Sequence, residues 1–247
     1  MDTAATAEEE LARARSTFRN QGRWGADDAL GTLNFLDNGK RAHAASLVRR
    51  GRPVSLAGVG ARWHLDRHRP EAFSGRGVLL DVARAVAGPG GELADGFPIR
   101  EEHLRMAVEA QGATSTVRRG DIVLVRTGQL ARCRRLGDWT GYASGPAPGL
   151  SISTLGWLHG TDIAAAATDT AGFEVRPHEI ASAATAATAP LREIALPGLG
   201  LPLGAKFDLE ELAEDCAADG VYEFLLVAAP LPVSGGDHAP VNPIAIK

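Results

Sequence analysis

Cysteine and aromatic residues are scarce in this chain of 247 residues. Cys133 and Cys216 are the only cysteines, and two are too few for the disulfide framework of a small secreted domain. Each lies in a stretch that favours a helix, so we expect free thiols in a reducing compartment. Aromatic residues make up 5% of the chain. The abundance of Ala and Gly instead favours close packing of the backbone.

An excess of positive charge and long apolar runs are also missing. The net charge is −4 and the pI is near 6.0, so no basic field is available for nucleic acid or an anionic membrane. No apolar run is long enough to span a bilayer. The chain starts Met1-Asp2-Thr3-Ala4, which is unlike a secretory or transit signal. We therefore expect a cytoplasmic protein that binds neither nucleic acid nor membrane.

Three common catalytic or binding motifs are absent. The sequence has no Gly-x-Ser-x-Gly elbow, no glycine-rich loop that would cradle a phosphate and no Cys-x-x-Cys pair. These absences exclude the usual serine-hydrolase, P-loop and thiol-redox arrangements.

The composition is that of an ordinary globular domain, with 45% hydrophobic and 23% charged residues. A chain of this length can bury roughly 70–75% of its unfolded surface. Residues 4–18 form a charged segment with helical periodicity but only a thin apolar stripe, so we expect it to dock on something, with another subunit as one option. We predict a helical arm at 1–21 and a single domain at 22–247.

Apolar runs and turn residues alternate along the domain. The clearest strand is Asp-Ile-Val-Leu-Val-Arg at 121–126. Asp37 or Asn38 can cap a helix that ends near Arg50, before Gly51. Other strands are expected at 53–57, 77–82, 163–168, 222–229 and 241–246, and other helices at 100–111, 130–136, 151–158 and 208–217. This alternation predicts an α/β or mixed α+β fold.

The segment 62–70 carries the densest chemistry, with His64, Asp66 and His68 at alternate positions. In an extended backbone these three side chains share one face. They could form a metal site, or an acid/base pair in which a carboxylate orients an imidazole. The alternative is a polar surface loop, where His and Asp are common.

Arginines crowd the same segment, at Arg62, Arg67 and Arg69. A dication beside three guanidinium groups loses electrostatic stabilisation. The same arginines would suit an anionic or carbonyl-rich small molecule.

Other candidate residues follow predicted strands. Arg126 and Thr127 lie at the end of the strand at 121–126, where open α/β sheets place ligand-binding groups. They are candidates for a substrate clamp, or simply a turn with a capping Thr. Asp169 ends another strand, and its side chain could lie with Arg126 and Thr127 at the same edge of the sheet. His238 follows a Gly-rich segment and is either a second wall of the site or an exposed loop residue.

A set of sequence blocks extends over nearly the whole chain. The most distinctive is Tyr-Glu-Phe-Leu-Leu-Val-Ala-Ala-Pro-Leu at 222–231, continued by Pro-Val-Asn-Pro-Ile-Ala-Ile at 240–246. Further blocks lie at 22–34, 75–82, 120–128, 148–151 and 169–170. In this order the blocks resemble the cyclase family that includes kynurenine formamidase and isatin hydrolase. The resemblance implies a swivelling β/β/α fold, with a mixed sheet or open barrel flanked by helices, and a homodimer or homotetramer.

The metal motif of that family is degenerate in this chain. The family holds a divalent metal through His-x-x-x-His-x-Asp, a further His, and a His and a Glu in the second half. The first His of that motif falls on Gly60, whereas His64 and Asp66 match the next two positions and His68 matches only approximately. In the second half the ligand positions fall near Arg192 and on Ala205. If any metal is held, the candidate ligands are His64 and Asp66, but a zinc or manganese site needs three or four.

The resemblance and the missing ligands leave three functions open. The first is a metal-independent cyclase or isomerase of specialised metabolism that acts on a small carbonyl-rich or anionic substrate, with no cofactor. In that function His64, Asp66 and His68 are catalytic, and Arg126, Thr127, Asp169 and His238 bind the substrate. The second is a zinc- or manganese-dependent hydrolase of an amide or lactone, with a rebuilt site. The third is a non-catalytic binding or scaffold protein.

Overall fold

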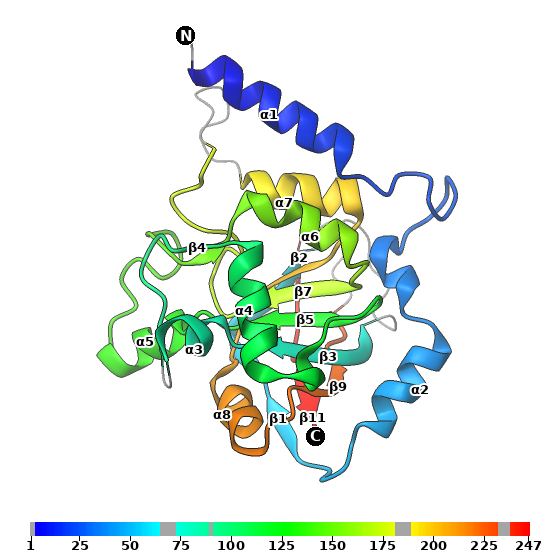
Figure 1. The fold of residues 1–247 in the computed structure, drawn as a ribbon, viewed down its shortest axis with the longest axis vertical. Coiled ribbons are helices and arrows are strands. Elements are labelled where there is room, and N and C mark those ends of the chain that lie inside the picture. The colour runs from blue at the N-terminus through cyan, green and yellow to red at the C-terminus, as the bar shows by residue number, and fades with distance from the viewer. Residues whose placement is uncertain (1–2, 65–72, 89–90, 181–188, 232–237) are drawn as a thin grey trace.

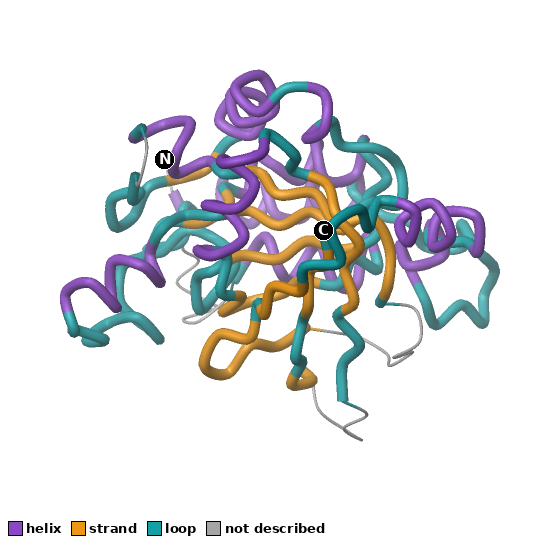
Figure 2. The backbone as a smooth tube through the Cα atoms, turned by 90° about the horizontal axis from the view of Figure 1, so that it is seen from below, coloured by secondary structure: helices purple, strands orange, loops and turns teal. Residues whose placement is uncertain are grey.

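A curled mixed sheet runs through the centre of the protein, as the computed structural model shows (Figures 1 and 2). The structure describes residues 3–64, 73–88, 91–180, 189–231 and 238–247. Within these ranges nine strands follow the spatial order β1-β11-β9-β3-β5-β7-β8-β2-β10. They are β1 (Pro53–Ser55), β2 (Ala57–His64), β3 (Ser74–Leu80), β5 (Ile122–Val125), β7 (Ala165–Thr168), β8 (Leu203–Phe207), β9 (Glu223–Val227), β10 (His238–Pro240) and β11 (Ile244–Ile246).

The four central strands β3, β5, β7 and β8 are parallel, and the strands on both flanks are antiparallel. A separate two-stranded parallel ladder joins β4 (Pro98–Ile99) to β6 (Gly149–Leu150). The predicted mixed sheet flanked by helices is thereby confirmed.

Helices cover both faces of the sheet. In Figure 1, α6 and α7 lie above the strands with α1 above them, α3, α4 and α5 lie in front and to the left, and α8 lies below. The helices are α1 (Thr3–Thr17), α2 (Asn38–Ser46), α3 (Val82–Ala87), α4 (Glu101–Gln111), α5 (Gln129–Leu136), α6 (Leu155–Gly160), α7 (Pro190–Ile194) and α8 (Glu210–Asp219). None of the described helices is long and apolar enough to cross a membrane.

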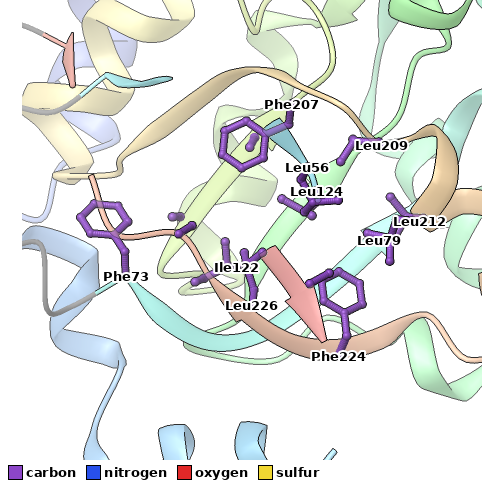
Figure 3. Close-up of a cluster of buried hydrophobic side chains, with 14 of the residues drawn as sticks. Leu56, Phe73, Leu79, Ile122, Leu124, Phe207, Leu209, Leu212, Phe224 and Leu226 are labelled. Atoms are coloured by element: carbon purple, nitrogen blue, oxygen red, sulfur yellow. The ribbon is translucent and has the colours of Figure 1, made fainter. Parts of the chain in front are cut away.

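Two hydrophobic cores lie on opposite faces of the sheet. In β5, Ile122 and Leu124 point into one core and Val123 and Val125 into the other, which follows from the period of two in a strand. All four residues are buried, as expected for a parallel strand covered on both faces. Figure 3 shows the first core, where side chains from the strands meet those that precede and begin α8.

The arm at the N-terminus packs on the second core of its own chain. Leu11 of α1 is buried there and Phe18 packs beside it. Arg15 also forms an ion pair with Glu193 of α7, at 3.2 Å between Nη2 and Oε2. The predicted helix is confirmed, whereas its contact with another subunit stays a prediction, as does the division into an arm and one domain.

The boundaries of several elements differ from those predicted. The helix capped by Asp37 ends at Ser46 rather than near Arg50, although Asp37 does accept a hydrogen bond from the Lys40 N–H at 2.7 Å. The strand predicted at 77–82 spans Ser74–Leu80, because Asp81 caps α3 through the Arg84 N–H. Strand β8 was not predicted, since Leu-Gly-Ala-Lys-Phe has no β-branched residue to signal a strand.

Candidate functional site

One face of strand β2 is apolar and packs in the first core, and the opposite face is polar. Trp63 is fully buried among aromatic side chains, and its Nε1–H donates to the Ala228 carbonyl at 2.9 Å. Ala61 belongs to the same core. This anchoring fixes the alternation of the strand, so Arg62 and His64 lie together on the opposite face.

Two histidines predicted for the site meet across strands. β10 pairs antiparallel with β2, which places His238 directly opposite His64. Their ring centroids are 6.3 Å apart, with 54° between the ring planes. His64 is buried, at 6% exposure, and His238 is exposed. The structure therefore brings together the start of the motif segment and the histidine near the C-terminus.

Asp66 and His68 lie outside the described residues. The predicted face shared by His64, Asp66 and His68 is therefore untested, and so is the His64–Asp66 pair as a metal site.

Strand β8 lies on the other side of β2 and contributes Lys206. Ala205 is opposite Arg62 in the ladder, and the next residue, Lys206, has a left-handed backbone with φ 62°. The Lys206 N–H donates to the Thr170 carbonyl at 2.9 Å. Its ammonium nitrogen lies 5.9 Å from the centroid of the Tyr142 ring. A Cβ built on Gly60 would lie 3.8 Å from this nitrogen, so the ammonium is close to Gly60.

Arg62, Arg176 and Lys206 form a group that we call the Tyr142 cation cluster. Burial, together with the charges of Arg62 and Arg176, lowers the pKa of Lys206. Arg176 donates to the carbonyls of Ala143 and Tyr142 at 2.7 and 3.0 Å. Arg62 donates to the Ala171 carbonyl at 3.3 Å. Across the described part of the chain, no carboxylate forms an ion pair with any of the three cations.

A second polar cluster lies at the carboxyl ends of the parallel strands. Arg126 follows β5, is 2% exposed, and donates from Nε and Nη2 to the two carboxylate oxygens of Glu210 at 2.9 and 2.7 Å. Its Nη1 donates to Asp81 at 2.9 Å. Burial alone would lower the pKa of Arg126, but the hydrogen bonds and the two carboxylates raise it. These contacts give Arg126 a structural function, and its predicted function as a substrate clamp stays a prediction.

Asp169 and Thr127 are brought together at the same end of the sheet. The fully buried carboxylate of Asp169 accepts from the Thr127 N–H at 2.9 Å, the Thr127 hydroxyl at 2.8 Å and the Gly128 N–H at 2.8 Å. Burial raises the pKa of Asp169 to about 6. The Tyr142 hydroxyl donates to the Asp169 carbonyl at 2.7 Å, so this cluster adjoins the Tyr142 cation cluster.

The donor set at the positions implied for a metal does not fit one. Gly60 and Ala205 have no ligating atom, and Arg192 of α7 has a guanidinium that only donates hydrogen bonds. Among the described residues no group of three or more His, Cys, Asp or Glu could hold a metal ion. The cation nearest to Gly60 is instead the Lys206 ammonium.

Sequence reasoning missed Lys206, Arg176 and Tyr142. Lys206 directly follows Ala205, the position at which the family resemblance implies a metal ligand. Its place beside that position is the one feature of the sequence that could have identified it. Arg176 and Tyr142 lie in loops, and nothing in the sequence indicates that they approach β2 and β8. Cys133 and Cys216 are buried free thiols, as predicted.

Comparisons with known proteins identify the class. The Cyclase family model matches residues 45–175, which is more than half of the chain, so the chain belongs to the cyclase family. A crystal structure described as a novel cyclase is 26% identical, with a TM-score of 0.79, and the match covers 94% of this chain and 99% of the other. No curated protein matches the chain.

More distant structures share the fold. Isatin hydrolase A from Ralstonia solanacearum is 14% identical with a TM-score of 0.56, and the match covers 78% of this chain and 80% of the other. A structure described as a potential metal-dependent hydrolase with cyclase activity is also 14% identical, with a TM-score of 0.50 and coverage of 79% and 86%. The predicted resemblance to the cyclase family is confirmed.

Proposed function

We propose that this protein is an enzyme that cyclises or isomerises a small carbonyl-rich or anionic molecule of specialised metabolism without a metal ion. Membership of the cyclase family supports an enzyme. The observation that carries the proposal is the set of residues beside β2, where Gly60 and Ala205 stand at implied ligand positions and Lys206 supplies a cation. A fixed cation can stabilise negative charge that develops on a substrate oxygen.

In this proposal His64 moves the proton. An imidazole takes up and releases protons near neutral pH, and His64 lies on the same face of β2 as Arg62. An isomerisation removes a proton from one substrate atom and returns it to another, so it consumes neither water nor oxidant. Orientation of the substrate beside one acid/base group is then sufficient for catalysis. His238, opposite His64, forms a wall of the site.

The proposal is tested by turnover and metal content together. Small carboxylated and carbonyl-rich compounds are first screened for stabilisation of the purified protein, and the hits are assayed for conversion. We expect no stoichiometric zinc or manganese by elemental analysis, and activity that survives a chelator. His64→Ala should lower kcat by roughly 10²–10⁴-fold.

The matched control is His43→Ala, which changes an exposed histidine of α2 and should leave kcat unchanged. If activity survives His64→Ala within a factor of a few, His64 is not the acid/base group. In that case Asp169 and His238 are the next residues to test.

A metal-dependent hydrolase of an amide or lactone is the second candidate. The fold shared with structures described as hydrolases supports it, and the neighbouring rings of His64 and His238 could supply two ligands. One tightly bound metal per chain, lost on His64→Ala together with activity, would establish this function. Binding of a small molecule without any turnover would instead indicate a non-catalytic binding protein.

A further inference from the structure

We infer that the Tyr142 cation cluster is a binding site for an oxyanion, a carboxylate or phosphate group carried by a small molecule. The inference deepens the proposed function, because it names the group of the substrate that is held and the residues that hold it. It does not depend on turnover, since anion binding can be measured without a reaction.

The first support is the missing counter-charge. Elsewhere in the described ranges Arg76, Arg84, Arg126 and Arg132 are buried or half-buried and pair with carboxylates. The half-buried Arg41 and Arg192 do not pair with a carboxylate within these ranges, but they lie apart from each other, on α2 and α7. Arg62, Arg176 and Lys206 are half-buried and have no such partner within the described chain. Three cations gathered in a partly desolvated place repel one another, and an anion would relieve that repulsion.

The second support is the number of donors that the three cations retain. Each arginine is held by backbone carbonyls but retains further N–H groups, because a guanidinium has five. The Nε of Arg176 is buried and has no hydrogen-bond partner. The Lys206 ammonium has three donors. A planar or tetrahedral oxyanion can accept several such charge-assisted hydrogen bonds at once.

The third support is the small size of the neighbouring residues. Each cation has a small residue beside it: Gly60 lies near Lys206, Gly172 near Arg176, and Ala205 opposite Arg62. A Cβ at Gly60 would contact the Lys206 side chain at 3.7 Å, and one at Gly172 would contact Arg176 at 3.7 Å. Larger residues at these positions would fill the space beside the charged groups. Burial beside two other cations lowers the pKa of Lys206. The same arrangement would attract an anion.

The test compares defined anions with a neutral analogue. Binding of benzoate, inorganic phosphate and neutral benzamide is measured by calorimetry at low ionic strength. We expect benzoate or phosphate to bind and benzamide not to bind, and the stronger of the two anions identifies the group. Lys206→Met and Arg62→Gln should each weaken binding of that anion by about tenfold or more, as is usual for a lost charge-assisted hydrogen bond.

Two controls make the result specific. Arg49→Gln removes an exposed charge after α2 and should leave the affinity unchanged, whereas Lys206→Arg keeps the charge and should retain most of the binding. Circular dichroism of each variant establishes that it is folded. The inference is overturned if neither anion binds, or if Lys206→Met and Arg62→Gln both bind within twofold of the parent.

A second measurement uses the rarity of lysine. The chain has only Lys40, Lys206 and Lys247, so ¹³C-methylated lysines give few NMR signals, and Lys206→Arg assigns its own. Because an adjacent anion favours the charged form, the bound anion should raise the pKa of Lys206 and leave that of exposed amines unchanged. His64→Ala should lower turnover but leave this shift in place, which separates failure of the proposed function from failure of the inferred site.

Discussion

Lys206 combines three features that are costly for the fold. Its backbone is left-handed, with φ 62°, a conformation that costs a residue with a side chain roughly 1–2 kcal/mol. Its ammonium is half-buried, and Arg62 and Arg176 lie near enough to lower its pKa. Residues that destabilise a fold in this way are commonly kept for activity.

The first prediction follows from this cost. Lys206→Met should stabilise the protein by about 0.5–2 kcal/mol, because it removes the desolvated charge and the repulsion while keeping a side chain of similar length. Urea unfolding at neutral pH measures the change. Arg49→Gln, at an exposed position after α2, is expected to change stability by less than about 0.5 kcal/mol. A loss of stability in Lys206→Met would show that the ammonium is well solvated or paired.

The second prediction concerns the buried Asp169. Its pKa is raised from 3.8 to about 6 in the folded protein, so the folded state binds this proton more tightly than the unfolded chain. Between pH ~4 and ~6 the unfolded state loses the proton first, and the contribution of Asp169 to stability falls as the pH rises. Relative to Asp169→Asn, the parent should lose about 1–3 kcal/mol over that interval.

Unfolding free energies measured at several pH values test this slope. The change of the unfolding free energy with pH is compared, rather than its absolute value. Asn also replaces an oxygen that accepts from the Gly128 N–H, so the absolute value changes for a second reason. Asp27→Asn, at an exposed position, should follow the parent at each pH. Parallel curves for the parent and Asp169→Asn would contradict the raised pKa.

The residues of the candidate site could be predicted only in part. His64 and His238 were predicted and lie opposite each other, and Thr127 and Asp169 were predicted and share hydrogen bonds. Thr127 and Asp169 follow apolar runs that mark strands, whereas the two histidines were chosen for their chemistry and not from a strand signal. Arg176 and Tyr142 were not predicted, because loop conformation places them and no periodicity in the sequence encodes it.

At the level of secondary structure, β8 depends on the absence of a side chain at Gly204. A Cβ there would lie 2.4 Å from the Cβ of Ala167, and 2.9 and 3.0 Å from ring atoms of Phe207 and Trp63. The third prediction is that Gly204→Ala destabilises the protein by about 1–3 kcal/mol, the usual cost of overpacking. Because β8 adjoins β2, we expect the variant also to weaken anion binding at Arg62 and Lys206.

Thermal and urea unfolding of this variant are compared with those of Gly160→Ala. Gly160 ends α6, and no atom lies within 4 Å of a Cβ built there. That substitution should be neutral or stabilise by up to about 1 kcal/mol, because alanine favours a helix. Equal stability of the two variants would indicate that the sheet relaxes around Gly204 at little cost.

The elements that could be predicted are those with strong local signals. β5 has four apolar residues in a row and Asp37 has the geometry of a helix cap, and both were predicted correctly. β8 was missed because glycine and alanine occupy it for reasons of space, not of strand propensity. Boundaries shifted where a side chain such as that of Asp81 ends one element by capping the next.

At the scale of the molecule, the sheet order was not predictable from periodicity. Alternation of strands and helices indicates a layered fold, but it does not reveal that β2 lies between β8 and β10. That arrangement joins segments far apart in the sequence, and it alone brings His64, His238 and Lys206 to one region. The resemblance to the cyclase family gave the architecture, and the family match and the structural matches confirm it.

The exposed face of α1 and the cavity beside it bear on the oligomeric state of the whole molecule. Helix α1 lies at one end of the protein, on α7 (Figure 1), and buries only a thin stripe that includes Leu11. Beside it, a cavity of about 580 Å³ is lined by the segments 20–33 and 196–202. The family resemblance implies a symmetric homo-oligomer, and the exposed face of α1 beside this cavity is the surface that we propose for the contact with a second copy.

The fourth prediction is that the protein is a homodimer or homotetramer in which residues before Gly22 contact another subunit or cover its cavity. Light scattering at micromolar concentration should then give a multiple of the 25.8 kDa chain mass. Removal of residues 1–17 should reduce that mass, because the intersubunit contact is lost, whereas Arg105→Gln on the exposed side of α4 should not. A monomer in the intact protein would contradict the assembly, and an oligomer that survives the truncation would place the contact elsewhere on the surface.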